Sequence, residues 1–243
     1  MVNTKQKGFT LVEIAIVLVI IGLLLGGILK GQELINSARV RNLADQNSGT
    51  QAAYYGFIDR YRAVPGDMTA ANACNAIGAS NLPTTANCTG TPAIGGNGNG
   101  SLDAEDYPEA AALWAQLAGA GFIQGSFTGI AANDAAYVAS TVAPVNAFNG
   151  RVMLTRSDSY AVETGTPSAR LAFVFGNQIP VSILRELDVK IDDSQPATGV
   201  LRHTDVTGGT TVFNTTAACV TAGTPDIWNI DGAEQSCNAM FIY

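Results

Sequence analysis

The chain has 243 residues, of which 47% are hydrophobic and only 14% are charged, and its formal net charge is -7. This length is enough for one anchor helix and one globular head with a hydrophobic core. The acidic balance argues against nucleic-acid binding by the head as a whole, because phosphate contacts need Lys and Arg, although a local basic tip stays open. A nucleophile elbow, a P-loop and metal-ligand spacing are all absent from the sequence, so we expect no enzyme.

The N-terminal stretch from Lys5 to Leu29 reads KQKGFTLVEIAIVLVIIGLLLGGIL. Its apolar run from Phe9 to Leu29 is interrupted by Thr10 and Glu13. As a helix the run would be about 30 Å long, which matches the hydrocarbon core of a bilayer. Two lysines precede it, so the positive-inside tendency places the amino terminus in the cytoplasm and the residues after the run outside.

Two features distinguish this segment from an ordinary secretory signal or a plain anchor. A secretory signal has its small-residue cleavage site after the apolar run, whereas here the small residue Gly8 precedes it. A carboxylate within an apolar helix costs about 2.5–3.5 kcal/mol and usually has a partner. Glu13 therefore calls for a positively charged group close to it in the membrane or in an assembly.

The run KGFTLVEIAIVLVIIGLL resembles the N-terminal signature of type IV pilins and of the related type II secretion pseudopilins. The resemblance implies that a prepilin peptidase cuts between Gly8 and Phe9 and that Phe9 is then N-methylated. It also implies that Glu13 pairs with the Phe9 amine of a neighbouring subunit, which neutralises two charges and sets the register of a helical filament.

The same resemblance implies a location and a set of partners. The chain is expected to span the inner membrane once before assembly and then to become part of an extracellular pilus on the bacterial cell surface. Its partners would be further copies of the chain, the prepilin peptidase and the pilus assembly machinery. The subunit could instead be a minor pilin or a type II secretion pseudopilin, or the head could be an adhesin or binding module that the helix mounts on a pilus.

We divide the chain into a leader at 1–8, a membrane or filament-core half of the helix at 9–29, an amphipathic half at 30–64 and a head at 65–243. After residue 29 the apolar positions narrow to one face at helical spacing, as far as Tyr61. We expect Pro65 and Gly66 to end this helix.

Four glycines lie close together in the helix, within residues 22–31, at Gly22, Gly26, Gly27 and Gly31. Many type IV pilins have a proline in this helix, but here none precedes Pro65. Each glycine weakens a helix by about 1 kcal/mol relative to alanine, and their four-residue spacing also lets helices approach closely. We hypothesise that this stretch loosens or partly melts in a filament; the alternative is that the glycines serve only helix packing.

The four cysteines, Cys74, Cys88, Cys219 and Cys237, fit an oxidising compartment. Three pairings are conceivable. We favour the local one, Cys74–Cys88 and Cys219–Cys237, because each bond closes a loop of roughly 15–19 residues, worth about 3 kcal/mol. A zinc site is disfavoured, since the sequence has no Cys-x-x-Cys pair and His203 is its single imidazole.

In many type IV pilins a C-terminal disulfide encloses a loop that contributes to subunit contacts or surface recognition, and Cys219 and Cys237 match that placement. Trp228 lies inside this loop and is either an exposed contact residue or a plug for the sheet. Within LDVKIDDSQPATGVLR, which resembles a stretch near the carboxyl end of pilin-like heads, the Asp192–Asp193 pair is interpreted as a solvated helix end. His203 lies in a polar, turn-like context.

The head is predicted to complete an α+β pilin fold, with a small antiparallel sheet packed on the long helix. Segment 69–100 is rich in Ala, Asn, Thr and Gly, so we expect a surface loop there. A helix should start near Pro108, with Trp114 as a core anchor, and a second helix is expected over 180–193. Short β-prone runs predict strands at 135–141, 151–157, 159–164 and 170–176.

The stretch GGNGNGSLDAED resembles the first part of a calcium loop. It places Asn97, Asn99, Asp103 and Asp106 at positions that can carry ligands, but its first position is Gly95, which has no ligand side chain. In the alternative interpretation, the segment is a Gly/Asn turn and Asp106 caps the helix that follows. No other cofactor is expected, so calcium is the one that the sequence leaves open.

Overall fold

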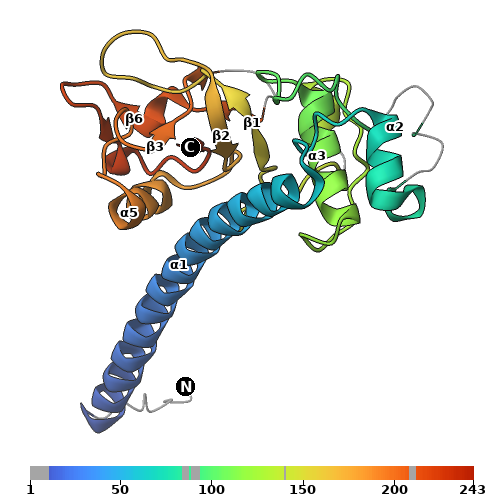
Figure 1. The fold of residues 1–243 in the computed structure, drawn as a ribbon. Helices are drawn as coiled ribbons and strands as arrows, with labels where there is room; N and C mark the ends of the chain where they lie inside the picture. Colours follow the sequence, from blue (N-terminus) through green and yellow to red (C-terminus); the bar gives the residue numbers. More distant parts are fainter. Residues whose placement is uncertain (1–10, 84–87, 89–93, 140, 208–211) are drawn as a thin grey trace, which may run out of the picture. The chain divides into compact units, whose positions relative to one another are not determined.

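A computed structural model describes residues 11–83, 88, 94–139, 141–207 and 212–243 (Figure 1). The chain divides into two units, 1–39 and 40–243. Helix α1 (Leu11–Tyr61) supplies the whole described part of the first unit and continues into the second.

Within the second unit, α1 buries one face at intervals of three or four residues. The buried positions are Val40, Leu43, Asn47, Thr50, Ala53, Tyr54 and Phe57. This is the amphipathic pattern that the sequence predicts for the second half of the helix. The helix ends at Tyr61, slightly earlier than expected, because Arg62 already adopts a left-handed conformation with a φ of 54°. Pro65 therefore follows the end of the helix rather than causing it.

The head contains a four-stranded antiparallel sheet with the order β1-β2-β8-β3. Its strands are β1 (Met153–Ser157), β2 (Arg170–Val174), β8 (Ala239–Ile242) and β3 (Leu201–His203). Two smaller pairs join β4 (Val206–Thr207) to β5 (Asn214–Thr215) and β6 (Val220–Thr221) to β7 (Ile227–Trp228). A long helix with a small antiparallel sheet confirms the α+β pilin fold.

Short helices lie beside this sheet in the head (Figure 1). They are α2 (Ala70–Ala73), continued by a π turn at Cys74–Gly78 and a 3-10 turn at Ala79–Asn81, then α3 (Tyr107–Gly119), α4 (Asp134–Ala139) and α5 (Val181–Ile191), with 3-10 turns at Ala217–Cys219 and Ile230–Gly232.

Helix α3 forms the centre of the core on the α2 side of the head. The Asp106 side chain accepts a hydrogen bond from the Glu109 N–H at 2.8 Å, which confirms the predicted N-cap. Trp114 is 1% exposed, and its indole N–H donates to the Tyr137 hydroxyl at 2.8 Å. Trp114 is thus the core anchor that the sequence predicts.

Two of the predicted strands are wrong. Residues 135–141 lie mostly in helix α4, because the Asn133 side chain accepts the Ala136 N–H and starts a helical turn despite the β-prone residues that follow. Residues 159–164 form no strand; their one ladder contact is an isolated bridge between Tyr160 and Thr204. The other two predicted strands and the helix over 180–193 are confirmed as β1, β2 and α5.

The expectation that segment 69–100 is a surface loop is also wrong in part. Ile77, Leu82 and Ile94 belong to the buried core. Ile77 lies in the π turn that contacts α3, Leu82 packs against Gly119 at the end of α3, and Ile94 packs against Gly129. Both local disulfides, Cys74–Cys88 and Cys219–Cys237, are present and confirm the favoured pairing.

Candidate functional site

The first half of α1 is apolar, and the described residues of the chain leave it uncovered. Its large apolar side chains from Leu11 to Leu29 are between 46% and 91% exposed. In the part of the chain that the structure describes, α1 is the helix long and apolar enough to cross a membrane, with a mean hydropathy of 2.8 in its most apolar window. Length and composition also fit a signal sequence, so the residues at the start of the run decide between the two.

Glu13 lies in the first turn of α1 and is exposed, as the predicted pairing with another subunit requires. A carboxylate in the first turn also interacts favourably with the positive end of the helix dipole. Gly8 and Phe9 lie outside the described residues. Their cleavage and methylation, and the contact between Glu13 and a Phe9 amine, stay predictions.

Gly22, Gly26, Gly27 and Gly31 all lie within regular α-helix. A Cβ added at any of the four would meet no atom within 4 Å. The fold of the single chain therefore does not require glycine at these positions. Their predicted roles, close approach to other helices or local loosening in a filament, concern contacts with other molecules and remain hypotheses.

The C-terminal disulfide loop is anchored by Trp228, which is 4% exposed. Its indole N–H donates to the carboxylate of Asp188 on α5 at 2.7 Å. Of the two interpretations, the plug is confirmed and the exposed contact residue is not. Asp188 also accepts the Ser194 N–H at 3.2 Å, so this one carboxylate joins α5 to both following loops. Burial raises the pKa of Asp188 to about 6.

Asp192 and Asp193 follow Asp188 at the end of α5. One carboxylate oxygen of each of the three residues lies within 4.8 Å of the other two. Asp192 accepts the Leu201 N–H at 2.7 Å, and Asp193 accepts the Gln195 N–H at 2.9 Å. The interpretation of the pair as a solvated helix end is thus incomplete, because both carboxylates fasten the connection to β3. A Cβ at residue 199 would come within 2.1 Å of an Asp192 oxygen, which explains the glycine there.

His203 lies in strand β3 rather than in a turn, which corrects the sequence interpretation. Its Nδ1 bonds the Thr204 carbonyl, and its ring packs on Trp228 with centroids 6.4 Å apart. Burial lowers its pKa. Within the described residues the ring forms no hydrogen bond to a hydroxyl nucleophile, so its contacts are those of a core histidine.

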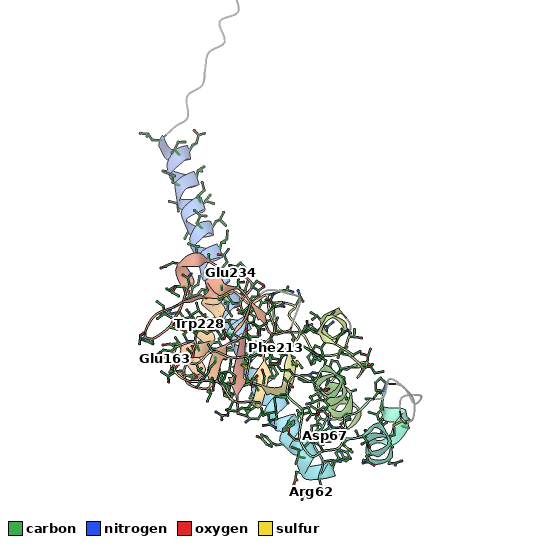
Figure 2. The ribbon with its side chains drawn as sticks, turned by 90° about the horizontal axis from the view of Figure 1, so that it is seen from above. Arg62, Asp67, Glu163, Phe213, Trp228 and Glu234 are labelled. Carbon is green, nitrogen blue, oxygen red and sulfur yellow. A yellow bond between two sulfur atoms is a disulfide. The ribbon has the colours of Figure 1, made fainter. Side chains whose placement is uncertain are left out.

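A hollow of about 500 Å³ lies beside Trp228 and opens between α5 and the disulfide loop. Its wall combines polar and apolar side chains: Arg185, Ser194, Gln195, Thr221, Pro225, Ile227, Trp228, Asn229, Ile230 and Asp231. Ile227 and Ile230 are about half exposed. In Figure 2, Trp228 and Glu234 lie at one end of the head, while Arg62 and Asp67 lie at the other.

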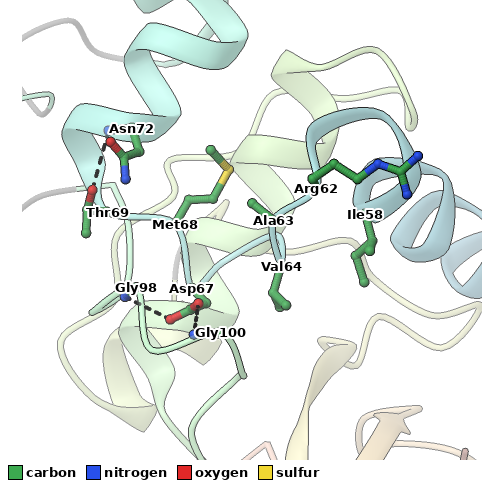
Figure 3. A pocket seen from close by; sticks show the side chains of 10 residues that line it. All are labelled: Ile58, Arg62, Ala63, Val64, Asp67, Met68, Thr69, Asn72, Gly98 and Gly100. Carbon is green, nitrogen blue, oxygen red and sulfur yellow. Dashed lines mark hydrogen bonds between the residues drawn. The ribbon is translucent and has the colours of Figure 1, made fainter.

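A second hollow, of about 300 Å³, follows the end of α1 (Figure 3). Ile58, Val64 and Met68 line its apolar side, and Gly98 and Gly100 belong to its rim. Asp67 is 4% exposed and lies under that rim, where it accepts N–H groups of the glycine-rich loop. The sequence analysis missed Asp67, whose partners are about thirty residues further along the chain.

The predicted calcium positions lie in this loop. Asn97 and Asn99 donate their side-chain amides to Asp103 at 2.6 and 2.9 Å, while Asp106 caps α3. Glu109, another buried carboxylate that the sequence analysis missed, accepts the Asp103 N–H at 2.7 Å, and burial raises its pKa. Gly95 packs directly on the backbone of residues 68–70. These contacts do not test calcium binding, and they fit the alternative interpretation of a Gly/Asn turn followed by a helix cap.

Comparison with known proteins finds a family match for the N-terminal part of the chain. Residues 3–29 match the family model described as the prokaryotic N-terminal methylation motif, which is the signature of type IV pilins and pseudopilins. Neither a curated protein nor a solved structure matches the chain. The motif implies processing by prepilin peptidase and delivery to the pilus assembly machinery, and pilins and pseudopilins are structural rather than enzymatic.

Proposed function

We propose that this protein is the structural subunit of an extracellular type IV pilus-like filament, built from many copies of the chain. One observation carries the proposal: the methylation motif opens an apolar helix whose large side chains from Leu11 to Leu29 are left exposed by the chain itself. Such a surface is stable only in lipid or against other apolar helices. The inner membrane provides the first environment, and a bundle of neighbouring subunits provides the second.

The proposed mechanism of assembly is lateral. After cleavage behind Gly8, the methylated amine of Phe9 is positively charged and meets the Glu13 carboxylate of a neighbouring subunit. An unpaired charge is costly in an apolar bundle. The axial offset that brings the two charges together is therefore more stable than the other offsets between neighbouring helices. The helices then form the fibre core and the heads form its outer layer.

Electron microscopy of sheared surface filaments, with mass spectrometry of their main subunit, tests this proposal. We expect this chain to dominate the filaments and to begin at methylated Phe9. Gly8→Glu, which removes the small residue before the cut, should leave full-length chain in the membrane and no filament. Filaments that contain only traces of the chain would contradict a major subunit and favour a minor pilin or secretion pseudopilin.

A second candidate function is a pilus-mounted adhesin. The hollow of about 500 Å³ beside Trp228 favours it, because the half-exposed Ile227 and Ile230 lie on its wall with unburied polar neighbours. For an adhesin, Ile227→Asp would abolish attachment of cells to their target surface while filaments remain abundant. Attachment at the wild-type level would count against this function.

A further inference from the structure

The loop that lines one hollow of the head folds around a carboxylate from a distant part of the chain. Asp67 Oδ1 accepts the N–H groups of Gly98 and Asn99 at 2.9 and 3.0 Å, and its Oδ2 accepts that of Gly100 at 2.8 Å (Figure 3). Gly98 and Gly100 have φ values of 76° and 91°, which side chains rarely tolerate. Consecutive N–H groups that converge in this way form a nest for an anion, and here the anion is Asp67.

Two Asn-Gly dipeptides lie in this nest, Asn97-Gly98 and Asn99-Gly100. Asn-Gly is chemically labile, because the glycine offers no side chain to hinder its own backbone nitrogen. That nitrogen loses its proton and attacks the asparagine Cγ, a C–N bond forms, and the side-chain amide leaves as ammonia. Water then opens the resulting succinimide to aspartate or isoaspartate.

The structure restrains all three groups that this reaction uses. The nucleophiles, the nitrogens of Gly98 and Gly100, donate to Asp67. The side-chain carbonyl of Asn97 accepts the Asn99 N–H at 2.9 Å, and that of Asn99 accepts the Ser101 N–H at 2.9 Å. These contacts fix the orientation of each side-chain amide group.

The leaving groups are held as well. The side-chain amides of Asn97 and Asn99 both donate to Asp103, at 2.6 and 2.9 Å. Conversion of either asparagine to a carboxylate would replace a donor by a negative charge beside Asp103. Asp67 and Glu109 add two more carboxylates that bond this loop. Deamidation would therefore open the loop and alter the rim of the hollow in Figure 3.

We propose that Asn97 and Asn99 are latent deamidation sites, which Asp67 and Asp103 hold closed in the folded head. Asp67 occupies the nucleophiles, and Asp103 holds the amides that would leave. The loop thus survives with a sequence that would be short-lived in an unfolded chain. This inference concerns the chemistry of the head and does not depend on filament assembly.

The test measures deamidation of the full mature chain in detergent during incubation at mildly alkaline pH. Peptide mapping by mass spectrometry follows the amide-to-acid conversion, and enzymatic methylation detects isoaspartate. The reference is the same chain unfolded in urea with its disulfides reduced. Asn149-Gly150 serves as an internal control, because the Gly150 N–H donates to Asn146 and not to Asp67. Asp59→Asn is the control variant, since Asp59 pairs with Arg62 at the surface.

We expect Asn97 and Asn99 to react far more slowly in the folded wild type than in the unfolded chain. Asp67→Ala removes both carboxylate oxygens and should raise the rate at Asn99 several-fold. The rise at Asn97 should be smaller, because the Gly98 N–H also donates to the backbone carbonyl of Asp67 at 2.8 Å. The rate at Asn149 and the rates in the Asp59→Asn variant should be unchanged. Equal rates in the folded and unfolded wild type would overturn the proposal. So would wild-type rates at both Asn97 and Asn99 in a folded Asp67→Ala variant.

If Asp67→Ala unfolds the head, the rate at Asn149 rises too, and Asp103→Ala decides. This variant removes both oxygens that accept the side-chain amides and leaves Asp67 in place. An increase at Asn97 and Asn99 alone supports the proposal, whereas wild-type rates at both overturn it.

Discussion

The first half of α1 and the head each contain a carboxylate in apolar surroundings, but only the head surrounds its carboxylate with hydrogen-bond donors. Glu13 lies in an apolar helix whose side chains find no cover within the chain. Asp188 is fully buried in the head, where Trp228 and the Ser194 N–H both donate to it. The head thus supplies hydrogen-bond donors to this carboxylate from its own residues, while the apolar helix leaves its surface for lipid or other subunits. The comparison shows that the head buries its apolar side chains within one chain, whereas the first half of α1 needs lipid or other subunits to cover its side chains.

Replacement of Glu13 should have the largest effect on this contrast. Glu13→Gln removes the charge that we expect to meet the Phe9 amine, so filaments should disappear while the head stays folded. Glu33→Gln is the matched control, because Glu33 lies further along α1 and pairs with Lys30 at the surface. Filament yield in sheared fractions measures both variants. Wild-type yield from Glu13→Gln would remove the charge pair from the mechanism.

Truncation of apolar side chains should separate the two halves of α1 by stability. Phe57 is 0% exposed, so Phe57→Ala should destabilise the head by about 3–5 kcal/mol. Leu18→Ala removes a mostly exposed side chain and should leave unfolding of the head unchanged. Urea denaturation in detergent, followed by tryptophan fluorescence, measures the difference. Similar losses in the two variants would show that the head depends on the first half of the helix as well.

The pH dependence of head stability should report on Asp188. Its pKa is raised by burial to about 6, so the folded head binds this proton more tightly than the unfolded chain does. The resulting stabilisation is complete below the unfolded pKa of about 4 and is lost as the pH rises through about 6, a change of about 3 kcal/mol.

The groups that face Asp188 are Trp228, the Ser194 N–H and the carboxylates of Asp192 and Asp193. Asp188→Asn should reduce the loss of stability between about pH 4 and pH 7, because the amide carries no charge at either pH. A smaller slope should remain, since burial also raises the pKa of Glu109 and of Asp134. Thermal melts across this range make the measurement, with Asp158→Asn at an exposed position as the control. A slope equal to that of the wild type in Asp188→Asn would assign it to the other groups.

Calcium should have the smallest effect, although the glycine-rich loop resembles part of a calcium site. Asp67 already fills the nest of N–H groups, and Asp103 is held by both asparagine amides. We therefore expect the melting temperature of the head to stay the same when calcium is added or chelated. A rise with calcium that Asp103→Asn abolishes would establish the site and correct this expectation.

Several elements were predictable because neighbouring residues alone determine them. The apolar run predicts the long helix α1 without any tertiary contact, and the motif at its start matches the model of the methylation motif. Asp106 before Pro108 predicts the start of α3, since a cap and a first-turn proline act within one helical turn. The short loops between cysteines likewise favoured the pairing that the structure contains.

Other features depend on residues far apart in the chain. The helix at Asp134–Ala139 overrides β-prone side chains because Asn133 caps it and Tyr137 reaches Trp114. Asp67 accepts hydrogen bonds from the glycine-rich loop about thirty residues further along the chain, and Asp188 accepts one from Trp228, 40 residues further along. No local sequence pattern predicts such pairs, because the donors that bond a buried carboxylate come from residues that only the fold brings close to it. The sequence by itself determined the helix and its motif, whereas only the tertiary structure decided which polar groups the head would bury.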